Sequence, residues 1–183
     1  EIKKLKSLTT LKLRGNPVKE LPAEIGLLRK LEILDIGFTQ IKALPSEFGN
    51  LKALKRLYID YTEIKHLPES TPKLTNLEYI HLFGPKTINL VETIDFLSVL
   101  PNFTELDLPV VSEIPDNLFK LKKLQKLNIY QHDFNDYRKP FETISKIESL
   151  KELRIYDYGS KVNLPSEIGS LKQLELLELI CSG

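Results

Sequence analysis

The 183-residue sequence contains a single cysteine, no methionine, no tryptophan and almost no charge imbalance. Cys181 alone rules out an internal disulfide, which removes one sign of secretion without excluding it. The formal net charge of +1 gives no electrostatic footprint for nucleic acid or for an anionic membrane. No apolar run approaches the roughly 18 residues of a membrane span, so we expect no membrane insertion.

Leucine, in contrast, is abundant, and it recurs with a regular period. The pattern L-x-x-L-x-[LI], with phenylalanine or isoleucine replacing a leucine in places, starts eight times, with steps of 23, 23, 23, 26, 21, 26 and 24 residues. The eight starts are Leu8, Leu31, Leu54, Leu77, Phe103, Leu124, Leu150 and Leu174. Each short apolar-alternating segment cannot bury its leucines alone, so the units must stack into one continuous core.

The segments LPAEIG at 21–26, LPSEFG at 44–49 and LPSEIG at 164–169 complete the repeat. With them the chain resembles the 23-residue leucine-rich repeats that are common in bacterial proteins. The resemblance covers residues 1–183 and implies a single α/β domain of about eight repeats. It implies a right-handed, horseshoe-shaped solenoid with a concave parallel β-sheet and short helices on the convex side.

Prolines follow most of the predicted strands and suit the first position of a helical segment. They are Pro22, Pro45, Pro68, Pro115 and Pro165. The two 26-residue units carry more helical signal. In 88–100 we expect one packed stripe of Val91, Ile94, Leu97 and Leu100. In 139–150 we expect a helix that starts at Pro140 and buries Phe141, Ile144 and Ile147.

One column departs from the family pattern, which usually has an asparagine three residues after the last strand leucine. There its side chain bonds the backbone of neighbouring coils. Here the column reads Asn16, Thr39, Thr62, Pro85, Val111, His132, Tyr158 and Ser182. Threonine or serine could serve in part, but proline, valine and tyrosine cannot supply the same bonds. We therefore expect irregular loops in the middle of the solenoid, and a structural role for His132.

The chain starts within a unit and ends just past a strand, with no polar capping unit at either end. We therefore expect the domain to be truncated at both ends and to belong to a longer protein. Uncapped terminal repeats allow end-to-end self-association. An export signal upstream would be invisible here, and an exported or cell-surface bacterial protein is slightly favoured over a cytoplasmic one.

Parallel stacking places equivalent residues of successive units about 4.7–4.9 Å apart, so columns of the concave face can be read from the sequence. Four such columns hold 32 residues and five of the seven tyrosines. Strand propensity explains Tyr58 and Tyr79, but Tyr61, Tyr130 and Tyr156 lie at or past strand ends. The predicted partner-binding residues are Asp35, Phe38, Arg56, Tyr58, Asp60, Tyr61, Tyr79, His81, Phe83, Asp107, Tyr130, Arg154, Tyr156 and Asp157.

Catalytic motifs are missing. There is no glycine-rich phosphate loop, no zinc-type cysteine–histidine spacing and no nucleophile elbow. His81 and Asp107 are neighbours in one column, where a carboxylate could orient the imidazole. The repeat places no serine or cysteine beside them, so we expect no enzyme, and neither a cofactor nor a metal.

The leading hypothesis is a non-catalytic scaffold that binds a protein partner on the concave face. Tyrosine and arginine are enriched among the buried anchors of protein interfaces. The mixed charges of the concave face argue against a groove that follows a phosphate backbone. Two alternatives stay open. The chain could be the recognition arm of a larger enzyme, because similar repeats occur beside GTPase domains and in ubiquitin-ligating effectors. It could also be a surface adhesin that binds glycan.

Overall fold

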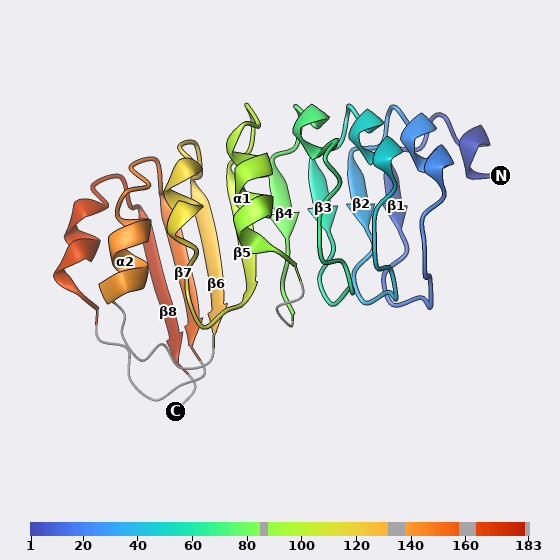
Figure 1. Ribbon diagram of the computed structural model, residues 1–183. Coiled ribbons are helices and arrows are strands. Elements are labelled where there is room, and N and C mark those ends of the chain that lie inside the picture. Colours follow the sequence, from blue (N-terminus) through green and yellow to red (C-terminus); the bar gives the residue numbers. More distant parts are fainter. Residues whose placement is uncertain (85–87, 132–137, 158–163, 182–183) are drawn as a thin grey trace.

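The computed structural model describes residues 1–84, 88–131, 138–157 and 164–181. They form a single eight-stranded parallel sheet in which the strand order follows the sequence (Figure 1). We number the coils of the solenoid by the strand that each contributes. The strands are β1 (Thr10–Lys12), β2 (Ile33–Asp35), β3 (Arg56–Tyr58), β4 (Tyr79–His81), β5 (Glu105–Val110), β6 (Lys126–Gln131), β7 (Glu152–Asp157) and β8 (Leu176–Cys181).

The pairing register matches the repeat read from the sequence. Leu34 pairs with Leu57, and Asp35 with Tyr58, which pairs in turn with His81. The register shifts between β5 and β6, after Asp107. The irregular loops expected in the middle fall largely on 85–87 and 132–137, outside the described residues. The predicted solenoid with stacked columns is therefore confirmed.

The leucine columns form one continuous core. Leu57 and Leu127 are fully buried, and Ile59 is 4% exposed. At the edge strand β8 the same column is open, since Leu177 is 38% exposed. Complete burial of a leucine contributes roughly 1.5–3 kcal/mol, so the inner coils hold most of the stabilising contacts.

Short 3₁₀ helices cover the side of the core opposite the sheet (Figure 1). Their bounds are η1 (Ile2–Lys4), η2 (Ala23–Leu27), η3 (Ser46–Asn50), η4 (Thr71–Lys73), η5 (Asp116–Lys120) and η6 (Ser166–Ser170). Four of the five prolines stand directly before such a helix, one position earlier than predicted, and their carbonyls accept its first hydrogen bond. Pro68 differs, because η4 begins three residues later.

The two predicted α-helices are present, as α1 (Leu90–Ser98) and α2 (Arg138–Ile144). The predicted stripe of α1 was wrong at Val91, which is 55% exposed. The helix begins at Leu90, and the 3.6-residue period then turns Leu90, Ile94 and Leu97 into the core.

Phe141, Ile144 and Ile147 are fully buried as predicted, but α2 ends at Ile144, so Ile147 lies beyond the helix. Pro140 is the third residue of the helix rather than the first. This is still within the first turn, where a backbone N–H has no intrahelical acceptor to lose.

The asparagine column works differently from the expectation. Asn16, Thr39 and Thr62 bond the carbonyl three residues earlier in their own coil, at 3.0, 2.7 and 2.7 Å. Each therefore closes a local turn after its strand. Val111 is buried as an apolar replacement. Pro85, His132, Tyr158 and Ser182 lie outside the described residues.

Candidate functional site

The candidate site is the face of the sheet that the helices leave uncovered, together with the residues just after each strand (Figure 1). On each strand the leucines point into the core, and the residues between them point to this concave face. The predicted residues divide by burial. Phe38 and Tyr61 are 49% and 42% exposed, whereas Asp35, Arg56, Tyr58, His81, Phe83, Tyr130, Arg154 and Tyr156 are half-buried.

Four predicted contact residues are buried in the structure. Asp60, Tyr79, Asp107 and Asp157 are between 1% and 7% exposed. Side chains from other coils contact Asp60 and Asp107. These four residues can support a binding surface, but they offer it little area.

Asp60 is held by an arginine from two coils away. The Arg14 guanidinium donates to both carboxylate oxygens of Asp60, at 2.9 and 2.6 Å, and lies 3.3 Å from Asp35. Gly37 makes this possible, because a Cβ there would lie 2.5 Å from Arg14 Nη1 and from Asp60 Oδ1. The hydrogen bond to Asp60 raises the pKa of Arg14 above its ordinary value and keeps the buried carboxylate paired.

Asp107 is the centre of a second polar cluster. Its Oδ2 accepts from the Tyr79 hydroxyl at 2.7 Å and lies 2.6 Å from His81 Nδ1. Asn128 Nδ2 donates to Oδ1 at 2.6 Å. Burial, followed by the Asp107 charge, raises the pKa of the Tyr79 phenol, so this hydroxyl stays protonated. The structure thus brings His81 and Asp107 together as predicted, within a hydrogen-bonded cluster.

Charged side chains on the concave face pair mainly with one another. Arg56 lies 3.3 Å from Glu105, and Lys126 lies 3.1 Å from Glu152. Arg154 continues the series at 2.9 Å from both Glu152 and Glu178. Because opposite charges alternate across β5 to β8, this surface presents little net field to a partner.

Exposed and half-buried aromatic side chains lie in contact with one another along the concave face. We use the name aromatic ridge for Phe38, Tyr61, Phe83, Tyr130 and Tyr156. Successive ring centroids are 4.4, 5.5, 4.4 and 4.6 Å apart. The contact between Phe83 and Tyr130 continues the ridge past β5, which lies between their strands.

The backbone of two ridge residues is unusual. Phe38 and Tyr61 have φ angles of 53° and 51°, in the left-handed region, whereas glycine fills the same column at Gly15 and Gly84. A bulky side chain in this region is an outlier that costs of order 1–3 kcal/mol. The glycines in the column were the available sequence signal for this conformation.

Sequence reasoning omitted four residues from the site, namely Arg14, Gly37, Glu105 and Asn128. The concave columns contain all four. Arg14 and Glu105 contact residues of their own columns two coils away, and Asn128 contacts Asp107 in the adjacent coil. Columns show which residues stack, but they do not show which side chains reach one another.

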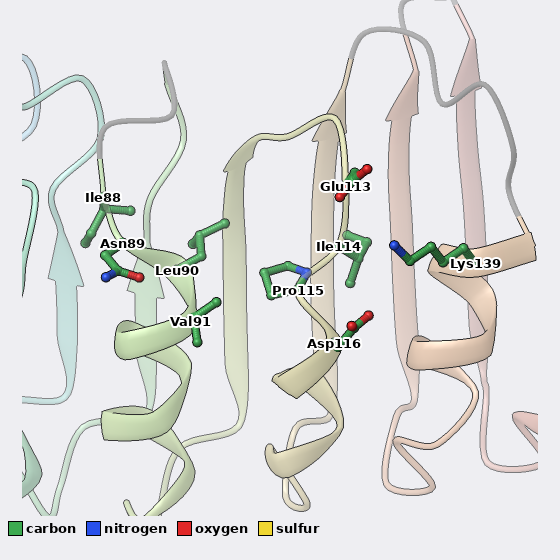
Figure 2. A pocket seen from close by; sticks show the side chains of 9 residues that line it. All are labelled: Ile88, Asn89, Leu90, Val91, Glu113, Ile114, Pro115, Asp116 and Lys139. Atoms are coloured by element: carbon green, nitrogen blue, oxygen red, sulfur yellow. The ribbon is translucent and has the colours of Figure 1, made fainter.

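A separate hollow of about 320 Å³ lies between α1, the start of η5 and α2 (Figure 2). Figure 2 shows Lys139 reaching from α2 toward Ile114, with Glu113 and Asp116 nearby. Its volume is at the lower end of small-molecule sites. In the described part of the chain no three histidine, cysteine or acidic residues gather as metal ligands. Among the same residues no helix is long and apolar enough to cross a membrane.

Comparisons with known proteins agree with this architecture. The family described as leucine-rich repeat region matches residues 1–136. No curated protein sequence matches the chain significantly. Internalin C2 of Listeria monocytogenes superposes with a TM-score of 0.70 at 22% identity, over 98% of this chain and 75% of its own.

Two further structures are similar. A leucine-rich repeat protein of Leptospira interrogans has a TM-score of 0.59 at 24% identity, over 98% of this chain. The chain spans 56% of that protein's length. The plant peptide hormone receptor RGFR1, solved in complex with RGF2, has a TM-score of 0.54 at 25% identity, over 96% of this chain and 33% of its own. With eight stacked coils and a family match that covers most of its residues, the chain belongs to the leucine-rich repeat family.

Proposed function

We propose that this domain is a non-catalytic scaffold that binds a protein partner on its concave face. The observation that carries the proposal is the aromatic ridge beside a sheet face whose charges are already paired. Aromatic side chains are the anchors that protein interfaces favour, and a concave solenoid surface is the one that such repeats use for binding. The receptor RGFR1 has a similar fold and was solved in complex with RGF2, which supports the same general role.

The absence of catalysis is part of the proposal. The His81–Asp107 pair has the geometry of an oriented imidazole. Its nearest hydroxyl belongs to Tyr79, whose raised pKa makes it a poor nucleophile. The pair is better explained as support for the sheet face.

Tyr58 and Tyr156 provide the direct test. A photo-crosslinking residue at position 58 identifies the partner, and the same residue at Val99 on the helical side is the control. Tyr58→Ala and Tyr156→Ala should then each weaken binding of the partner by about 2 kcal/mol or more, while the thermal stability of the domain stays nearly unchanged. Val99→Ala, a change at a residue that is 64% exposed, should leave the affinity intact.

The proposal fails if both tyrosine variants bind every crosslinked partner as tightly as the wild type does. Binding on a glycan array that these variants abolish, without any protein partner, would favour the adhesin alternative. The recognition arm of a GTPase or of a ubiquitin-ligase effector predicts a catalytic domain in the same gene, so the complete gene decides that alternative.

The proposal also covers the source and the cellular location of the protein. Similar structures from Leptospira and Listeria support a bacterial source, and we place the protein outside the cell or on its surface. Fractionation of the source organism tests this location. We also propose end-to-end association through the open edge of β8, where Leu177 and Ile180 are exposed. Sedimentation of the chain over a range of concentrations tests this association.

A further inference from the structure

The aromatic ridge has an arrangement that bears on what it can bind. Tyr61 stacks on Phe38 at 4.4 Å with an interplanar angle of 23°, and the Arg14 guanidinium lies 4.7 Å from the Phe38 ring centre. Two groups so close to the ring centre cannot share one face, so both faces of Phe38 are covered. Tyr130 and Tyr156 are also stacked, at 4.6 Å and 8°. At its exposed end the ridge therefore presents the ring edge of Phe38 to solvent.

This geometry discriminates between occupants. A sugar that stacks on an aromatic platform needs a free ring face, and the exposed end of the ridge has none at Phe38. A strongly charged partner segment finds few unpaired opposite charges, because Arg14 is engaged by Asp60 and Arg56 by Glu105. Projecting ring edges instead fit a hollow in an apolar, uncharged surface, as interface anchors do.

Backbone conformation gives independent evidence that these rings are kept for contact. Phe38 and Tyr61 occupy a left-handed conformation that glycine adopts without strain at Gly15 in the same column. Coil 1 has glycine at this position, so the turn there forms without a side chain. Strain at an exposed aromatic residue is expected where binding, and not folding, requires the side chain.

From these observations we infer that Phe38 and Tyr61 are the principal anchors of the concave site, and that they insert edge-first into an uncharged apolar hollow on a folded protein. The inference rests on the proposed function and specifies the chemistry of its partner.

Stability provides the first test, and it requires no partner. Phe38→Gly and Tyr61→Gly relieve the left-handed strain while they remove a stacked ring. We therefore expect each melting temperature to stay within about 3 °C of the wild-type value or to rise. Leu57→Gly, in the core, is the contrasting control and should lower it severely. If either ridge variant melts more than about 8 °C lower, the ring is a structural element and the inference is wrong.

Binding chemistry provides the second test. Amide NMR spectra are recorded during separate titrations with phenol, methyl α-D-glucopyranoside and methylguanidinium. Phenol, an uncharged apolar probe, should shift signals from residues 37–39 and 60–62. These shifts should disappear in the Phe38→Gly/Tyr61→Gly double variant. Larger shifts from the glucoside or from methylguanidinium at these residues would overturn the inference, as would no response to phenol.

The outcomes also separate this inference from the proposed function. If a crosslinked partner depends on Tyr58 and Tyr156 but the ridge ignores phenol, the scaffold proposal holds and only the anchors are misassigned. If phenol binds the ridge but Tyr58→Ala and Tyr156→Ala affect no partner, the apolar hot spot holds and the scaffold proposal fails.

Discussion

The first four coils and the last four share one core but differ in strand length and in repeat spacing. In coils 1 to 4 the strands are three residues long and follow one another at 23-residue steps. In coils 5 to 8 the strands have six residues each, and the steps vary between 21 and 26 residues. Both halves nevertheless bury equivalent leucines in one core.

Coils 2 and 5 also differ in the turn that follows the strand. In the first half a left-handed residue, such as Phe38, is followed by Thr39, whose hydroxyl binds the Ile36 carbonyl. The chain turns there and the strand ends. In coil 5 Val111 has no side-chain donor, and its backbone N–H bonds the Tyr130 carbonyl instead. Thus a threonine hydroxyl closes the turn in coils 2 and 3, whereas a ladder bond continues past the same position in coil 5.

The largest expected effect comes from comparing one core column in both halves. Leu57→Ala removes a fully buried side chain and should cost about 2–5 kcal/mol of unfolding free energy. Leu177→Ala, in the same column of β8, should cost much less because the side chain is already 38% exposed. Urea unfolding followed by circular dichroism measures both. Equal losses of unfolding free energy would show that further contacts bury Leu177 in solution.

An intermediate effect should follow from exchanging the turn residues. Thr39→Val gives coil 2 the residue that coil 5 carries, and it removes the 2.7 Å hydrogen bond to the Ile36 carbonyl. We expect a loss of about 1–2 kcal/mol, since a buried carbonyl loses a partner. The matched Val111→Thr change should not raise the unfolding free energy by a corresponding amount, because β5 already continues past the turn. If Thr39→Val is as stable as the wild type, the hydroxyl does not stabilise the turn.

The smallest effect concerns the ion pairs of the second half. The hydrogen bond from Lys126, together with that from Arg154, lowers the pKa of Glu152 below its ordinary value. Glu152 therefore contributes stability above its unfolded-state pKa, and this is lost as the pH falls through the lower folded-state value. We expect only a few tenths of a kcal/mol, because these pairs are partly exposed and screened.

The measurement for Glu152 is the difference in melting temperature between pH 7 and pH 3. Glu152→Gln should make this difference slightly smaller than in the wild type, and 1 M NaCl should reduce the effect further. A larger pH difference in the variant would contradict the assigned sign. The pair between Arg14 and buried Asp60, in the first half, should respond less to salt.

Repeat spacing is sufficient to predict the solenoid, because a fixed period of leucines has one way to share a core. It also places Asp35, Tyr58 and His81 correctly in one row. It does not reveal that Asp60 and Asp107 are buried, since their covering partners come from other coils. Nor does it predict the orientation of Val91, which depends on where the first turn of α1 begins.

The missing Cβ at Gly37 has a consequence for how the solenoid unfolds. Repeat arrays are usually described by energies within a coil and between adjacent coils, so they can fray from the ends one coil at a time. Because Gly37 has no side chain, Arg14 of coil 1 can bond Asp60 of coil 3. Arg56 of coil 3 likewise bonds Glu105 of coil 5. Opening one of these coils breaks contacts two steps away. Amide hydrogen exchange in coils 1 to 5 should therefore report one cooperative unit.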